Sequence, residues 1–169
     1  MSYNDKCLKM SLIDFRTIHQ PLTDAMDANI NNTLANPDSD LFVIITPMIH
    51  IHIRDLKTLL PGRWLCGDII DAALFLICRD SESHFAFSTN FYTWFSTHPD
   101  SYNSDFIQRS LKDVDPHRNG HLFEQKLVFF PINVNGNHWT LVAVNMNQKE
   151  ITYYDSMGGN NQVMIKTHL

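Results

Sequence analysis

Three apolar runs near the C-terminal end of the sequence constrain the fold most. Residues 127–134, 139–145 and 151–156 are rich in β-branched and aromatic side chains and have the length of strands. Short polar segments at 135–137 and 146–149 separate them, and such segments form tight turns. We therefore expect a terminal antiparallel sheet in which consecutive strands are paired.

The preceding residues contain both strand-like and helix-like patterns. The β-branched run at 43–46 and the alternating apolar positions of 49–53 predict two strands. Apolar residues at helical spacing predict a core helix from Trp64 to near Arg79, and a second, capped helix over 104–114. The expected fold class is α+β, with a central antiparallel sheet flanked by helices.

The length of 169 residues is that of one domain. Residues 27–40 are rich in Asn and Asp, whose side chains compete with regular backbone hydrogen bonding, and we interpret this stretch as a linker. Residues 1–40 then form an N-terminal extension with its linker, and residues 41–169 form the domain. The formal net charge of −5 and the lack of a Lys/Arg run argue against a nucleic-acid partner, which needs a concentrated basic face.

The cysteines indicate the compartment. Cys7, Cys66 and Cys78 are odd in number and match neither a disulfide framework nor a zinc pair, so we expect reduced thiols inside a cell. No apolar run approaches the roughly 20 residues of a membrane helix, and no secretory signal is found. His50 and His52 share a strand face but lack nearby carboxylate or thiol partners, so neither a metal nor another cofactor is expected.

His138 and Asp155 are the candidate catalytic pair. If the last two predicted strands form a hairpin closed by residues 146–149, the numbers of paired residues sum to a constant between 293 and 297. His138 then lies opposite residues 155–159, and Asp155 is its direct or diagonal neighbour. A carboxylate beside an imidazole fixes the ring tautomer, as in a catalytic triad, but a His and an Asp near strand ends are also common without any catalytic role.

Two tryptophans and one cysteine have similarly open interpretations. Trp64 and Trp139 are either ordinary core aromatics or the walls of a narrow apolar slot for a peptide. Cys66 lies near the start of the predicted helix, where a helix N-terminus can activate a thiol, but nothing in the sequence places it against His138, so a structural thiol is the favoured interpretation.

Six segments taken together carry a family resemblance. They follow one another between residues 53 and 161, and they are 54–65, 68–71, 88–92, 127–132, 137–141 and 151–159. In this order they resemble the Ulp/SENP family of ubiquitin-like-protein-specific cysteine proteases, whose catalytic His and Asp are separated as His138 and Asp155 are. The resemblance implies a papain-like α+β fold and a thiol hydrolase that cleaves after the C-terminal Gly-Gly of a SUMO-type modifier, by processing or deconjugation.

The resemblance also implies roles for individual residues. His138 would match the general base and Asp155 the acid that orients it. Trp64 and Trp139 would be the walls of the tunnel that admits the Gly-Gly tail, since only glycine lacks the Cβ that would collide with closely spaced indoles. Many relatives have Trp-Leu-Asn/Ser-Asp-Glu where this chain has Trp-Leu-Cys-Gly-Asp, so a carboxylate that helps to hold the modifier is displaced or missing, and Asp68 is the candidate substitute.

The second departure concerns the nucleophile. The family's catalytic Cys follows the Asp by several tens of residues, whereas this sequence has fourteen residues after Asp155 and no Cys among them. We therefore expect a partial protease domain that is inactive as a 169-residue chain. The alternatives are a noncatalytic module that binds a ubiquitin-like modifier and a degenerate mobile-element fragment. We expect an intracellular protein of the nucleus or the cytoplasm, the nucleus being suggested by the resemblance alone, and the oligomeric state stays open.

Overall fold

The computed structural model describes residues 21–37, 42–44, 50–79, 81, 83–98, 107 and 122–159. Its elements in chain order are α2 (Asp24–Leu34), β1 (Phe42–Ile44), β2 (His50–His52), α3 (Ile53–Leu56), the 3-10 helix η2 (Lys57–Leu59), α4 (Gly67–Cys78), β3 (His84–Ala86), α5 (Thr89–Thr97), the 3-10 helix η4 (Leu122–Glu124), β4 (Leu127–Val134), β5 (His138–Asn145) and β6 (Glu150–Tyr154). No helix in these ranges is both long enough and apolar enough to cross a bilayer.

The main sheet has four strands in the order β3-β4-β5-β6. Strands β4, β5 and β6 pair antiparallel, as predicted from the apolar runs and turns. In the last hairpin Leu141 pairs with Tyr154, and each pair of residue numbers sums to 295, within the predicted interval. The predicted hairpin and its register are therefore confirmed.

One strand makes the sheet mixed, which corrects the expectation of an antiparallel central sheet. Strand β3 pairs parallel with β4, from His84 opposite Leu127 to Ala86 opposite Phe129. The N–H of Phe87, just beyond β3, still donates to the Phe129 carbonyl at 2.9 Å. Parallel neighbours need a crossover connection, and here the chain between the two strands includes α5.

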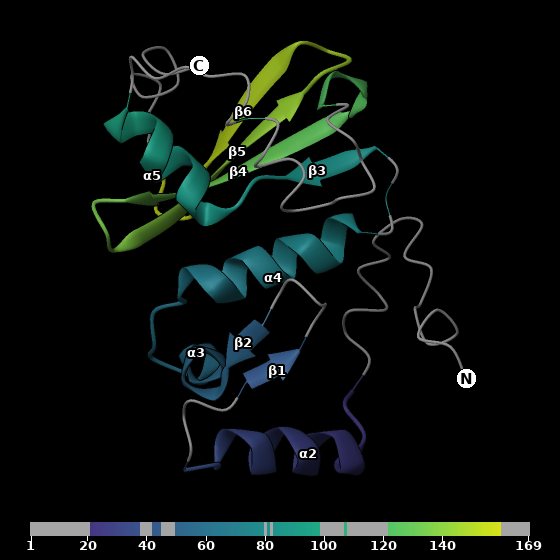
Figure 1. Cartoon of the computed structure of the whole chain (residues 1–169), viewed down its shortest axis with the longest axis vertical. Coiled ribbons are helices and arrows are strands. Elements are labelled where there is room, and N and C mark those ends of the chain that lie inside the picture. Colours follow the sequence, from purple (N-terminus) through teal and green to yellow (C-terminus); the bar gives the residue numbers. More distant parts are fainter. Residues whose placement is uncertain are drawn as a thin grey trace.

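Helix α4 lies between the two sheets of the molecule (Figure 1). It begins three residues later than the predicted start at Trp64, because Cys66 has extended backbone angles and is the N-cap residue. On one side, Ile69 and Ala72 of α4 form a buried cluster with Ile51 of β2. A second cluster, containing Phe85, Phe87 and Val128, is packed between the main sheet and α5.

The small sheet consists of β1 and β2, which pair antiparallel. Both lie within or beside the predicted strands at 43–46 and 49–53, but β2 ends at His52 and α3 begins at Ile53. The apolar alternation therefore continues one residue beyond the strand, into a buried position at the start of a helix. Residues 45–49 lie outside the described part of the chain.

Helix α2 gives regular structure to residues 24–34, which include part of the stretch interpreted as a linker. Thr23 is its N-cap, with a side-chain oxygen that accepts the Met26 N–H at 3.2 Å. Asp24 and Asp27 lie in the first turn, where negative charge is favoured by the helix dipole. Capping and charge thus compensate for the low intrinsic helix preference of the Asn-rich sequence. The division into an extension and a domain stays a prediction, and the helix predicted over 104–114 lies outside the described residues except at position 107, which is helical.

Candidate active site

His138 and Asp155 lie together at one end of the last hairpin. His138 is the first residue of β5, and Asp155 follows the last residue of β6. The Nε2 atom of His138 is 2.6 Å from Oδ1 of Asp155, a short charge-assisted distance. Both side chains are largely shielded, with exposed fractions of 19% and 6%. The structure therefore brings together the two residues that the hairpin arithmetic placed next to each other.

The strand register and the following turn explain this contact. If the observed register continues beyond Tyr154, His138 lies opposite residue 157, and Asp155 is its diagonal neighbour on the same sheet face. The backbone N–H of Met157 donates to the same Oδ1 atom at 2.8 Å, and the Gly158 N–H donates to the Asp155 carbonyl at 3.1 Å. Gly158 has a φ of 74°, a conformation that glycine adopts at little cost, so the turn holds Asp155 against the imidazole.

The electrostatics of the pair define the proton positions. The hydrogen bond from His138, followed by the one from the Met157 N–H, lowers the pKa of Asp155 below its ordinary value of 3.8. Asp155 is thus an ionised acceptor at neutral pH, and the bonded Nε2 of a neutral His138 ring carries the hydrogen. In that tautomer Nδ1 has the free lone pair and can accept a proton.

Trp139 is fixed between β5 and the segment that leads into α4. Its indole N–H donates to the carbonyl of Leu65 at 2.8 Å. Trp64, the residue before Leu65, has an exposed fraction of 69%. The bond brings the segments of both tryptophans together beside His138, while the role of the indoles as slot walls stays a prediction.

The carboxylate predicted to hold the modifier is on the surface. Asp68 lies in the first turn of α4 and is exposed. Gly67 precedes it, and a Cβ at that position would lie 2.8 Å from Oγ1 of Thr89 and 3.8 Å from the Trp139 ring. Asp68 therefore lies in the helical turn that adjoins Trp139. Its contact with a modifier stays a prediction.

A buried link between α4 and α5 was missed by the sequence reasoning. Asp71 of α4 accepts the backbone N–H of Thr89 at 2.7 Å and the Thr89 hydroxyl at 3.1 Å. Asp71 thereby caps α5, whose N-cap residue Ser88 makes no side-chain capping bond. Burial raises the pKa of Asp71, and the two bonds from Thr89 partly oppose this. No periodic signal in the sequence relates two positions 18 residues apart, so the bond could not be predicted.

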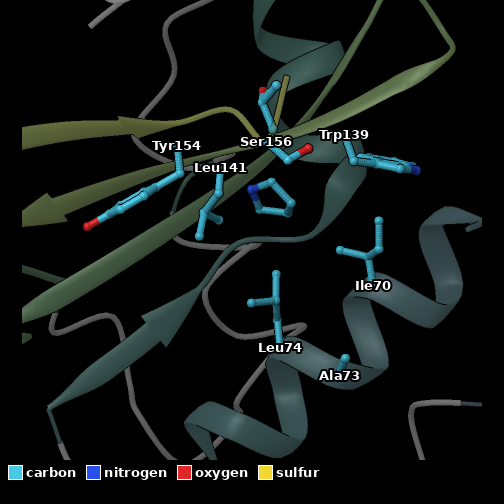
Figure 2. A pocket seen from close by; sticks show the side chains of 9 residues that line it. Ile70, Ala73, Leu74, Trp139, Leu141, Tyr154 and Ser156 are labelled. Atoms are coloured by element: carbon cyan, nitrogen blue, oxygen red, sulfur yellow. The ribbon is translucent and has the colours of Figure 1, made fainter. Parts of the chain in front are cut away.

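An open apolar groove of about 380 Å³ runs between α4 and strands β5 and β6 (Figure 2). Its lining residues are Ile70, Ala73, Leu74, Pro131, Trp139, Thr140, Leu141, Tyr154 and Ser156. Trp139 follows His138 in the chain, and Ser156 follows Asp155, so the groove adjoins the His–Asp pair. Sequence reasoning did not predict it, because its two walls belong to elements far apart in the chain.

The two described cysteines are free thiols at opposite ends of α4. Cys66 is the N-cap residue of α4, with Sγ 4.0 Å from the Asp55 carbonyl and 3.7 Å from the Thr58 hydroxyl. Cys78 is buried at the other end of α4. Cys7 lies outside the described residues. Within the described ranges no three His, Cys, Asp or Glu side chains form a group that could hold a metal ion.

Known proteins are similar to this chain in sequence and in fold. Residues 63–169 match the Ulp1 protease family, C-terminal catalytic domain. Ubiquitin-like-specific protease 1 of Saccharomyces cerevisiae is 29% identical over 140 residues, which are 83% of this chain and 20% of that protein. Sentrin-specific protease 2 of Mus musculus is 30% identical over 141 residues, 80% of this chain and 22% of that protein.

Solved structures agree with these sequence relatives. The C-terminal Ulp1 protease domain in complex with Smt3, the yeast ortholog of SUMO, superposes with a TM-score of 0.71 at 28% identity, over 86% of this chain and 63% of that chain. The SUMO protease Ulp1 with its catalytic cysteine oxidised to a sulfonic acid gives a TM-score of 0.69 over 87% and 63%. The chain thus spans about a fifth of the curated relatives and less than two thirds of the solved domains. The expected α+β fold of Ulp/SENP type is confirmed, and the chain belongs to the Ulp1 protease family, within its C-terminal catalytic domain.

Proposed function

We propose that this chain provides the base and the orienting acid of a cysteine protease that cleaves after the C-terminal Gly-Gly of a SUMO-like modifier. The observation that carries the proposal is the 2.6 Å contact between His138 and Asp155 in a member of the Ulp1 protease family. A solved relative is a complex of the Ulp1 protease domain with Smt3, which supports a SUMO-like modifier as the partner. The proposed substrates are the modifier precursor and its conjugates, in the nucleus or the cytoplasm.

In the proposed reaction His138 transfers two protons, one from the thiol to the leaving amine and one from water to the cysteine sulfur as the thioester breaks. Nδ1 accepts the proton of a cysteine thiol, and the thiolate attacks the carbonyl carbon of the last glycine, forming a C–S bond. The imidazolium, stabilised by Asp155, then gives the proton to the leaving amine as the C–N bond breaks. Water, deprotonated by His138, hydrolyses the thioester and releases the modifier carboxylate and the thiol. No metal or cofactor takes part.

Specificity for glycine would come from the tryptophans. Trp139 is held by its bond to Leu65, so its ring position is fixed before a substrate binds. If Trp64 covers the tail from the other side, residues with a Cβ collide with an indole, whereas Gly-Gly passes. Asp68 at the start of α4 is proposed to contact the body of the modifier.

The thiol is proposed to come from polypeptide other than residues 1–169. Cys66 is held by contacts within the segment 55–66, and Cys78 is buried at the far end of α4, so neither is proposed as the nucleophile. The 169-residue chain alone is therefore proposed to be inactive. The same observation favours one alternative function, a noncatalytic module that binds the modifier tail.

Two measurements on the purified 169-residue chain test these proposals. With a SUMO C-terminal fluorogenic reporter we expect no hydrolysis. Turnover that disappears in His138→Ala would contradict the proposed inactivity, and loss in Cys66→Ala would identify an unorthodox nucleophile.

Calorimetric titration with a SUMO ending in Gly-Gly should give saturable binding. Trp139→Ala should weaken this binding at least tenfold. Trp94→Ala, which removes an indole stacked on His98 in α5, is the matched control and should have no effect. Absence of binding, or equal loss in both variants, would overturn the tail-binding role.

A further inference from the structure

The carboxylate of Asp155 has three hydrogen-bond donors around it, two of them from the turn that follows β6. Oδ1 lies 2.6 Å from Nε2 of His138 and 2.8 Å from the backbone nitrogen of Met157. The backbone N–H of Gly159 also bonds to this carboxylate. The bond from His138 contributes most to the lowered pKa of Asp155, and the bonds from Met157 and Gly159 act in the same direction. The turn thus holds the carboxylate as well as the imidazole does.

Gly159 approaches this carboxylate more closely than a residue with a side chain could. A Cβ at position 159 would overlap Oδ2 of Asp155 and would lie 3.3 Å from its Cγ. Apart from the chain neighbours of Gly159, no other heavy atom of the described residues lies within 4 Å of that point. Gly158 is different, because it has a φ of 74° and a Cβ there would meet open space. Gly158 therefore bends the chain, whereas Gly159 leaves room for the carboxylate.

The carboxylate cannot move away from a Cβ without losing its other bonds. The side chain of Asp155 has an exposed fraction of only 6%, and its two oxygens belong to one planar group. A rotation that moves Oδ2 away from position 159 therefore also moves Oδ1, which is bonded to His138 and Met157. Without Oδ1 as acceptor, the neutral imidazole is no longer held with its hydrogen on Nε2, and the hydrogen can occupy Nδ1 instead.

We propose that Gly159 is a positioning residue of the His138–Asp155 pair: because it has no side chain, the Asp155 carboxylate can face His138, and any larger residue at position 159 turns the carboxylate away. The consequence for catalysis rests on the proposed function, since Nδ1 must be free of hydrogen to accept the proton of a thiol. The effect on the pair itself does not depend on that function.

Nuclear magnetic resonance of Gly159→Ala in the 169-residue chain tests this role without any need for activity. In the wild type, the ¹⁵N shifts of the His138 ring should report one neutral tautomer, with the hydrogen on Nε2. In Gly159→Ala they should report a mixture of the two tautomers. The ¹³C shift of the Asp155 carboxyl follows its titration, and the midpoint should rise by about half a pH unit or more in the variant, towards 3.8. The variants His138→Gln and Asp155→Asn identify the two signals.

Gly62→Ala is the matched control. It adds a Cβ that meets no heavy atom within 4 Å, at a turn before α4 where φ is 75°, so it should reduce stability through backbone strain and leave both signals unchanged.

A double-mutant cycle identifies what the added methyl group meets. Gly159→Ala should lower the midpoint of urea unfolding in the wild-type background. It should leave the midpoint unchanged in Asp155→Ala, where the carboxylate is missing. Because Gly159 is exposed, we expect all these variants to fold, and far-UV circular dichroism checks this.

Three results would overturn the positioning role. They are His138 and Asp155 signals that do not change in Gly159→Ala, the same changes in Gly62→Ala, and equal losses of stability in the two backgrounds of the cycle. Calorimetric titration of the wild type with SUMO is made in parallel. Absence of SUMO binding together with the expected shifts would contradict the proposed function and still support the positioning role of Gly159.

Discussion

Replacing Thr89 by valine removes one hydrogen-bond donor and keeps the shape of a buried side chain. The Thr89 hydroxyl donates to Oδ2 of Asp71 at 3.1 Å, and the residue has an exposed fraction of 7%. A hydrogen bond to a charged group contributes about 1.5–3 kcal/mol to stability. Because Asp71 is only partly buried and keeps the backbone N–H of Thr89, we expect Thr89→Val to lower the free energy of unfolding by about 1.5–2 kcal/mol.

Thr140→Val is the matched control for this change. Thr140 is equally buried, with an exposed fraction of 6%, but its hydroxyl donates to a neutral carbonyl, that of Ile132, at 3.3 Å. A neutral bond contributes about 0.5–1.5 kcal/mol, and this long one should lie near the lower limit. Urea unfolding followed by far-UV circular dichroism measures both losses at pH 7, under conditions where the slopes agree.

The pH dependence separates the charged bond from a packing effect. Removing the hydroxyl takes away an interaction that lowers the pKa of Asp71, so the folded-state pKa is higher in Thr89→Val than in the wild type. The stability deficit of the variant is therefore complete at neutral pH and shrinks as the pH falls through these two values, where Asp71 becomes neutral. A deficit that equals that of Thr140→Val, or that stays constant down to pH 4, would refute the argument.

Two further changes address the His–Asp pair and the N-terminal helix. Because the pKa of Asp155 is lowered from 3.8, its contribution to stability is complete above that value and is lost as the pH falls through the folded-state pKa. In urea unfolding, wild type should therefore be more stable than Asp155→Asn at pH 6, and this advantage should shrink below pH 4. A difference that stays constant with pH would contradict the ionised pair. Thr23→Ala removes the acceptor for the Met26 N–H and should destabilise α2 by about 1 kcal/mol. Amide hydrogen exchange should then become faster in α2 and stay unchanged in β5. Equal acceleration in both elements would contradict a local capping role.

The last hairpin could be predicted because local rules determine it. Two strand-like runs and a short polar turn leave few possible registers, and a slip by one residue would move Val142, which is 1% exposed, to the opposite face. The same arithmetic placed Asp155 beside His138. The part of the site that depends on this hairpin was therefore accessible from the sequence.

The remaining features depend on contacts that no local pattern encodes. Strand β3 has only three residues, and it is defined by its pairing with β4, a strand that comes much later in the chain, after α5. Helix α2 begins at a capping bond from Thr23 that overrides the low helix preference of its asparagines. The bond between Asp71 and Thr89, like the groove, is created where separate elements meet, so tertiary packing had to be known before either could be found.

Pro131 in β4 has a consequence for how the sheet can grow. Alternate residues of a strand direct their backbone groups to the same edge, so the nitrogen of Pro131 points to the edge where Phe129 accepts the Phe87 N–H. Strand β3 has ended by that point, so the missing N–H costs no bond to β3 in the described sheet. An incoming strand would find no donor at Pro131, and proline at such an edge opposes unwanted pairing. Pro131 therefore opposes edge-to-edge pairing at this stretch of β4.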